Sequence, residues 1–135
     1  MARLYHAWKR FEQHIADKWK QNDGTAQRTT SGRQGQDTGY DIDAEWEGIP
    51  FIVECKSSVK GSKRFTLEKE WFDHLDQALQ PSNDRIPDPD TVPVLVFNFY
   101  RSTEIYCLRG YAFWKLLETA YQAGIDKERA THVCY

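Results

Sequence analysis

Two carboxylates and one lysine stand close together in residues 39–58, which read GYDIDAEWEGIPFIVECKSS. Glu54 and Lys56 are two positions apart in a segment that reads as a strand, so their side chains share one face. Asp41 lies on the polar face of the strand before it, and Glu47-Gly48 fits a hairpin turn between the two strands. Because a hairpin places its strands side by side, the three side chains could converge.

The sequence around the second carboxylate makes this group unusual. Glu54 and Lys56 follow the apolar run 51–53, which belongs in a sheet interior, and burying charge is costly unless the charges pair or bind a metal. Two carboxylates at one point offer the hard oxygen ligands that Mg²⁺ prefers. A bound metal can activate water and neutralise charge on a phosphodiester, while a lysine can orient that water or stabilise developing charge. The alternative is an ordinary Glu–Lys strand face exposed to solvent, because the motif is short.

The elements that must position these residues follow from hydrophobic periodicity and turn signals. In chain order we expect helix 3–21, a short strand near 27–30, strands 40–46 and 49–57, a helix that Thr66 caps, strands 92–100 and 104–108, and helix 111–123, which Gly124 ends. This order, α-β-β-β-α-β-β-α, predicts an α/β fold in which a mixed central sheet is flanked by helices. A chain of 135 residues fits a single domain over residues 1–135.

The strand over residues 40–46 alternates between apolar and polar side chains. The alternation predicts one buried face formed by Tyr40, Ile42, Ala44 and Trp46, and one polar face formed by Asp41, Asp43 and Glu45. In the following strand, the side chains of Phe51, Val53 and Cys55 are expected to point into the core. Asp43 is therefore a candidate neighbour of the Asp41 carboxylate.

Composition narrows the class of protein. Hydrophobic residues make up 40% and aromatic residues 14%, which argues against a disordered chain. No apolar run is long enough to span a membrane, and the N-terminus is too polar for a secretory signal. Three widely spaced cysteines fit a reducing compartment, so we expect a cytoplasmic protein without membrane partners. The net charge of −2 argues against a broad, charge-driven coat on nucleic acid.

The charge is distributed unevenly along the chain. Residues 1–65 hold 11 Lys and Arg against 9 Asp and Glu, whereas residues 66–135 hold 7 against 11. Two stretches in the first half, 24–36 and 57–65, are rich in Gly, Ser and Thr and locally basic, so they read as basic loops. Their basic side chains are Arg28, Arg33, Lys60, Lys63 and Arg64. Two solvated loops without a binding role are the alternative.

The motif resembles a known nuclease superfamily. Asp41 followed by Glu54-Cys55-Lys56 resembles the PD-(D/E)XK nucleases, with Tyr40 where that family often has Pro. Further features resemble the archaeal-type Holliday junction resolvases of this superfamily. Eight residues separate the segment Arg28-Thr-Thr-Ser-Gly from Asp41-Ile-Asp-Ala. A Ser directly follows Lys56, and the first helix carries the acid Glu12. The resemblance covers roughly residues 8–115 and implies a restriction-endonuclease-like core.

The resemblance also implies catalytic roles. Asp41 and Glu54 would be metal ligands, and Lys56 would be the catalytic lysine. Glu12 would join the metal site or orient its water, although a solvated helix glutamate is the alternative. Mg²⁺ would be the cofactor, and Mn²⁺ would substitute for it.

DNA contacts are implied in the two basic loops. Ser31 matches the loop serine of these resolvases and would act at the site, while Arg28 would contact a phosphate near the scissile bond. A plain loop serine is the alternative for Ser31. The other expected DNA-binding side chains are Arg33, Lys60, Lys63 and Arg64.

The activity implied is that of a structure-selective DNA endonuclease, a Holliday junction resolvase that leaves 5′-phosphates. Its partners would be four-way junction DNA and a second copy of itself, because two symmetric cuts need two sites at fixed spacing. Such an enzyme of DNA recombination and repair suits a prokaryotic or phage-infected cell. Two alternatives stay open. One is another nuclease of this superfamily acting on duplex, flap or single-stranded DNA, and the other is a non-catalytic interaction module whose acidic second half docks a basic partner.

Overall fold

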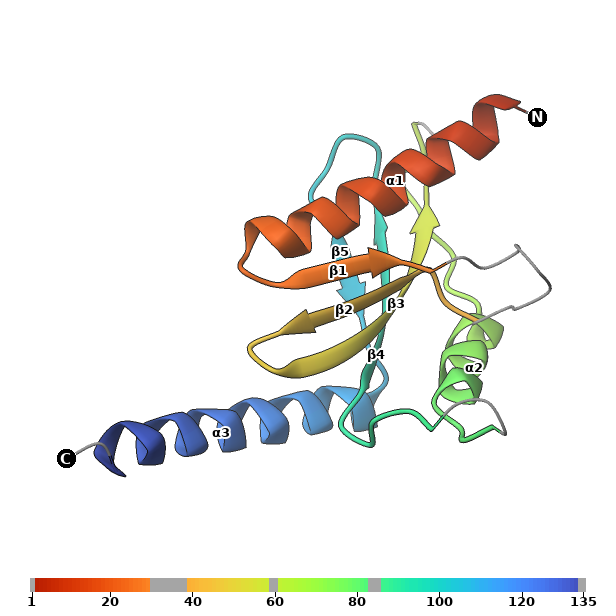
Figure 1. The fold of residues 1–135 in the computed structure, drawn as a ribbon. Coiled ribbons are helices and arrows are strands. Elements are labelled where there is room, and N and C mark those ends of the chain that lie inside the picture. Colours follow the sequence, from red (N-terminus) through yellow and green to blue (C-terminus); the bar gives the residue numbers. More distant parts are fainter. Residues whose placement is uncertain (1, 30–38, 59–60, 83–85, 134–135) are drawn as a thin grey trace.

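The structure is a computed structural model that describes residues 2–29, 39–58, 61–82 and 86–133, with side chains from residue 8 to residue 130 (Figure 1). Its elements are α1 (Ala2–Gln21), β1 (Thr25–Arg28), β2 (Ile42–Trp46), β3 (Ile49–Ser57), α2 (Lys69–Ala78), β4 (Val92–Asn98), β5 (Ile105–Cys107) and α3 (Gly110–Val133). The order of helices and strands is the one predicted, and the α/β class is confirmed. Within the described residues, no helix is both long and apolar enough to cross a membrane.

The five strands form one mixed sheet in the order β1-β2-β3-β4-β5. β3 pairs in parallel with β4, and the other neighbours are antiparallel. β2 and β3 form the predicted hairpin, in which Ile42 is opposite Val53. β3 is thus hydrogen-bonded on both sides, which makes it the rigid element that carries Glu54 and Lys56.

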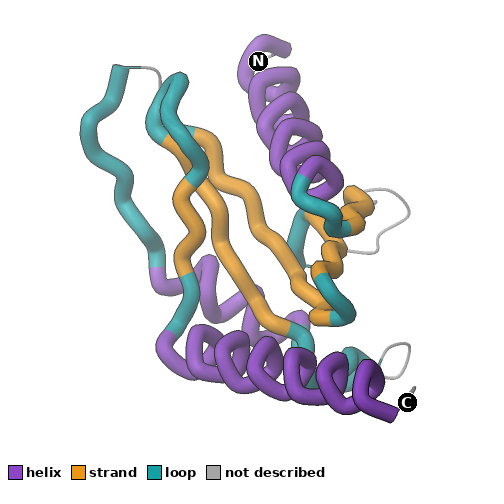
Figure 2. The backbone as a smooth tube through the Cα atoms, turned by 90° about the vertical axis from the view of Figure 1, so that its left-hand side faces the viewer, coloured by secondary structure: helices purple, strands orange, loops and turns teal. Residues whose placement is uncertain are grey.

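Helices cover both faces of this sheet (Figures 1 and 2). On one face α1 and α3 pack on a cluster that includes Val53 and Cys55, as predicted for these two side chains. On the other face α2 packs on a second cluster that includes Ile52 and Leu75. Because side chains alternate along β3, Glu54 and Lys56 lie on the α2 side of the sheet, at the end of the strand.

Two predictions around β2 were wrong. The strand begins at Ile42, and Tyr40 belongs to the α2-side cluster instead of sharing the face of Ile42. Gly39 precedes it with a φ of +76°, a conformation that turns the chain before the ladder begins. Trp46, expected to be buried, is exposed at the end of the strand, where the hairpin turns.

Three helix and strand boundaries also differ from the prediction. α2 begins at Lys69 after Glu68, so Thr66 does not cap it. β1 begins at Thr25, two residues before its predicted start. α3 does not end at Gly124 but continues to Val133, because glycine costs only about 1 kcal/mol in a helix interior and does not by itself end a helix.

A close backbone approach at Gly24 fixes the end of α1 against the sheet. A Cβ atom on this glycine would lie 2.8 Å from the Glu45 carbonyl oxygen and 3.0 Å from that of Trp19. Both obstacles are backbone atoms, which cannot rotate away. We therefore expect Gly24→Ala to lower the free energy of unfolding by about 1–3 kcal/mol. Urea unfolding measures this, with Gly110→Ala as the control because a Cβ there meets nothing within 4 Å. Equal effects of the two substitutions would contradict the close approach.

Candidate functional site

Three carboxylates from three separate parts of the fold meet at the end of β3. Glu54 comes from β3, Asp41 from the residue before β2, and Glu12 from the middle of α1. Asp41 and Glu12 are each only 6% exposed, and Glu54 is partly buried. The solvated helix glutamate that stood as the alternative for position 12 is therefore wrong. The predicted convergence of Asp41, Glu54 and Lys56 is confirmed by the contacts described below.

Backbone hydrogen bonds on both sides hold Asp41 in place. Its N–H donates to the Val53 carbonyl at 2.9 Å, and its carbonyl accepts from the Thr29 N–H at 2.8 Å. Its carboxylate oxygen Oδ2 accepts from the Cys55 N–H at 2.8 Å. The side chain thus satisfies a buried backbone donor of β3, which fixes the carboxylate beside Glu54.

The environment of Glu54 strongly favours its protonated form. Burial raises the pKa of Glu54 to about 9, and its hydrogen bond to Asp41 and the charges of Asp41 and Glu12 act in the same direction. Lys56 lowers the pKa, but its Nζ is 4.0 Å from Glu54 Oε1, too far to offset the other causes. Without a further cation, Glu54 therefore keeps a proton at neutral pH.

Arg28 of β1 pairs with Glu12 rather than standing free in a loop. Its Nη2 and Nε donate to Glu12 Oε2 at 2.6 Å and 3.1 Å. Burial and the Asp41 charge still raise the pKa of Glu12, although Arg28 lowers it. The pair joins α1 to β1 across 16 residues of sequence. The Arg28 guanidinium is thus engaged by a carboxylate, and its contact with a phosphate stays a prediction.

Lys56 rests on an aromatic ring of α2. Its Nζ lies 4.6 Å from the centroid of the Trp71 ring, a cation–π arrangement. This contact was not predicted from the sequence. No local signal could have revealed it, because strand and helix are brought together only by packing. The ring thus contacts the lysine on the side of the sheet on which Glu54 also lies.

Asp43 does not join the carboxylate group. Its Oδ1 accepts from the Tyr40 hydroxyl at 2.7 Å, which links the residue before the site to the strand. Together with Glu45 it lines a separate cleft beside Pro87 and Thr91. The contacts of Asp43 are therefore with the Tyr40 hydroxyl and this cleft, and not with the carboxylates of the site.

The donor set suits a hard cation only in part. No three His, Cys, Asp or Glu side chains among the described residues are grouped closely enough to hold a metal ion as they stand. Asp41 and Glu54 nevertheless present adjacent oxygen donors, and a divalent cation would take the place of the proton that burial and the Asp41 charge favour on Glu54. Mg²⁺ takes as few as one or two protein carboxylates, so this pair fits it. Both Arg28 hydrogen bonds go to Glu12 Oε2, so Glu12 could become a third ligand through Oε1 or by releasing Arg28.

The remaining candidate residues lie in the basic loops. Ser31, Arg33 and Lys60 fall outside the described residues. Lys63 and Arg64 are exposed in the segment that follows β3. Phe65 anchors that segment, since its ring stacks on Phe97 of β4 at 4.1 Å between centroids.

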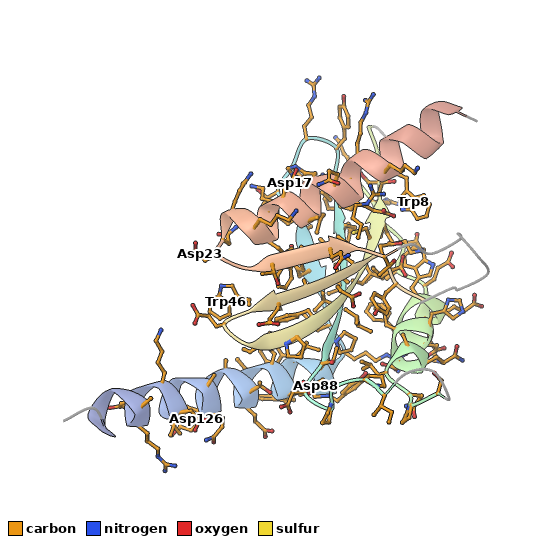
Figure 3. The ribbon with its side chains drawn as sticks, viewed as in Figure 1. Trp8, Asp17, Asp23, Trp46, Asp88 and Asp126 are labelled. Atoms are coloured by element: carbon orange, nitrogen blue, oxygen red, sulfur yellow. The ribbon has the colours of Figure 1, made fainter. Side chains whose placement is uncertain are left out.

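An exposed tryptophan lies on the same helix as Glu12. Trp8, one helical turn before Glu12, is exposed, and Figure 3 shows it far from Trp46 at the opposite end of the α1 face.

No family model, curated protein or solved structure matches this chain. Function must therefore be argued from the arrangement of its own residues.

Proposed function

We propose that the protein is a Mg²⁺-dependent DNA endonuclease, and specifically a resolvase that cuts four-way junctions. The observation that carries the proposal is the pair formed by buried Asp41 and partly buried Glu54, with Lys56 two residues after Glu54 on the same face of one strand. Ion pairs that only stabilise a fold rarely place two carboxylates side by side, because the two negative charges repel each other. Sites that bind a metal do so routinely.

The contacts support a separate catalytic role for each of these side chains. When bound, Mg²⁺, or Mn²⁺ in its place, would neutralise charge on the scissile phosphate and activate water. Asp41 and Glu54 supply the oxygen ligands, and the Cys55 amide keeps Asp41 oriented. Lys56, held over Trp71, donates a hydrogen bond that orients the attacking water or stabilises charge on the phosphate. Hydrolysis that releases the 3′ oxygen leaves a 5′-phosphate.

Glu12 and Arg28 act at the boundary of this group. Their ion pair is only partly exposed, with the Arg28 side chain 32% accessible and the Glu12 side chain 8%. A phosphate oxygen competes for the same guanidinium donors as the glutamate. DNA arriving at the site would therefore free Glu12 to turn toward the metal while Arg28 takes the phosphate, which unites the two roles implied by the resemblance.

The partners belong to the same proposal. The substrate would be read by shape and backbone, because the cationic side chains near the site would contact phosphates rather than base edges. Two symmetric cuts require a homodimer. The protein would act in the cytoplasm of a prokaryotic or phage-infected cell, in DNA recombination and repair.

A cleavage assay with matched substrates tests the function. The protein is incubated with Mg²⁺ and with one of four labelled DNAs of the same sequence: a four-way junction, a flap, a linear duplex and a single strand. We expect paired cuts in the junction that leave 5′-phosphates, and no cutting when EDTA replaces Mg²⁺. Preferential cutting of another substrate would indicate that the protein is a nuclease of the same superfamily with a different DNA substrate. If the folded protein cuts none of the four DNAs, the nuclease proposal is wrong and the non-catalytic interaction module is favoured.

Phosphate contacts by the segment after β3 predict a defined salt dependence. We expect the double substitution Lys63→Ala/Arg64→Ala to weaken junction binding and to reduce the slope of log K against log salt by about 1–2. Binding in Ca²⁺ between about 50 and 200 mM salt measures the slope without cleavage. Lys18→Ala/Lys20→Ala, which removes equal charge at the far end of α1, is the control. An unchanged slope in the first variant would remove this segment from the interface.

A further inference from the structure

α3 carries apolar side chains on two faces. Ala112, Leu116 and Ala120 pack on the core. A second apolar set points away from the core, and its exposed fractions are 45% for Phe113, 64% for Trp114, 45% for Leu117 and 73% for Tyr121. Their spacing of one, four and eight residues from the first places them on one stripe of the helix, which we call the outer stripe. A helix that is apolar on two faces is normally covered on both.

The outer stripe is also free of charge over most of its length. From Gly110 to Gly124, every position on it is aromatic, aliphatic or glycine, and Glu128 is the first charged residue. Figure 3 shows the acidic Asp126 farther along, in the C-terminal half of the helix. Depletion of charge at the centre of an apolar patch is typical of a protein–protein interface rather than of an ordinary surface.

Gly124 supplies a second and independent observation. It lies inside a 24-residue helix, where glycine costs about 1 kcal/mol relative to alanine. A Cβ atom at this position would meet nothing within 4 Å, so the packing of this chain alone gives no reason for a glycine. It follows Tyr121 by three residues and so lies on the outer stripe. Close approach of another backbone would account for it.

We propose that the outer stripe docks on the same stripe of a second copy of this chain across a two-fold axis. The stripe is self-complementary in size, because bulky Trp114 stands ten residues before Gly124 on one face. In an antiparallel pair, each Trp114 covers Gly124 of the partner subunit, and each Leu117 meets Tyr121 of the partner subunit. Such a pairing closes on itself and covers the outer stripe of both copies.

The exposed area of the outer stripe is consistent with a dimer of low affinity. Aromatic side chains bury up to about 150–250 Å² each, so the exposed parts of these four residues amount to about 500 Å² per copy. The total of about 1,000 Å² is near the lower limit for a specific interface. We therefore expect a dissociation constant in the range of about 1–100 μM. Figures 1 and 2 show α3 at the edge of the molecule, at the end of the sheet opposite the start of α1, where a second copy has access.

This pairing deepens the proposed function by naming the surface that joins two nuclease sites. It is tested by self-association alone, so its failure is distinguishable from a failure of DNA cleavage. Sedimentation velocity from about 1 to 300 μM should show a monomer–dimer equilibrium in the parent chain. Leu117→Lys and Gly124→Gln should each weaken dimerisation at least about tenfold.

Two controls make the outcome decisive. Ile86→Lys adds the same charge at an even more exposed apolar residue outside α3 and should leave the equilibrium unchanged. Gly124→Gln should raise the melting temperature of dilute monomer, because it improves helix propensity in open space. A parent chain that is monomeric throughout, or a dimer that Leu117→Lys does not weaken, overturns the proposal. So does a monomer that binds phosphatidylcholine vesicles through the outer stripe.

Discussion

Asp41→Asn is expected to reduce the rate of Mg²⁺-dependent junction cleavage at least about 10³-fold while the protein stays folded. Removal of one preorganised electrostatic contact to a transition state typically costs about 10²–10³-fold, and here a metal ligand is lost as well. Asparagine keeps an oxygen that can accept from the Cys55 amide, so the local backbone should remain in place. Single-turnover cleavage measures the effect at the chemical step.

The matched control for this substitution is Asp43→Asn. Asp43 lies two residues away and contacts the Tyr40 hydroxyl instead of the carboxylate group, so its variant should cleave at close to the parental rate. Lys56→Met is the companion variant, because its apolar side chain can still pack on Trp71 without the charge. A folded Asp41→Asn protein that cuts at the parental rate would show that the site is elsewhere.

In EDTA, the free energy of unfolding is expected to fall by a few kcal/mol as the pH rises from about 5 to 9. The pKa of Glu54 is near 4.5 in an unfolded chain and is raised to about 9 in the folded protein. Between these values the folded state holds a proton that the unfolded state has released, so stability decreases with rising pH. One such proton corresponds to a slope of about 1 kcal/mol per pH unit. Urea unfolding at several pH values measures it.

Glu54→Gln should remove most of this slope, whereas Glu45→Gln, which neutralises an exposed carboxylate of β2, should retain it. Mg²⁺ should stabilise the parent increasingly as the pH rises, because the metal competes with the proton for the same oxygens. The glutamine variant should gain little from Mg²⁺. Identical pH slopes in the parent and in Glu54→Gln would mean that the Glu54 carboxyl is not buried beside Asp41.

Pattern alone determined the order of the elements and the faces on which the side chains of residues 51–56 lie. Phe51, Val53 and Cys55 had to point one way and Glu54 and Lys56 the other, because side chains alternate along any strand. The hairpin turn then brought Asp41 to the same end of the sheet. The polar alternation of residues 40–46 was misleading at Tyr40, where the chain bends before the ladder starts and the periodicity no longer applies.

Tertiary structure alone decided the contacts that make these residues a site. Arg28 pairs with Glu12 because α1 lies against β1, and Trp71 lies under Lys56 because α2 packs on that face of β3. The strong rise in the pKa of Glu54 likewise needs its burial beside Asp41 and Glu12. Periodicity reports which face of its own element a residue occupies, and that is a local property. How the layers pack decides which side chain of the opposing element a residue contacts. It also decides how much water remains between the two side chains.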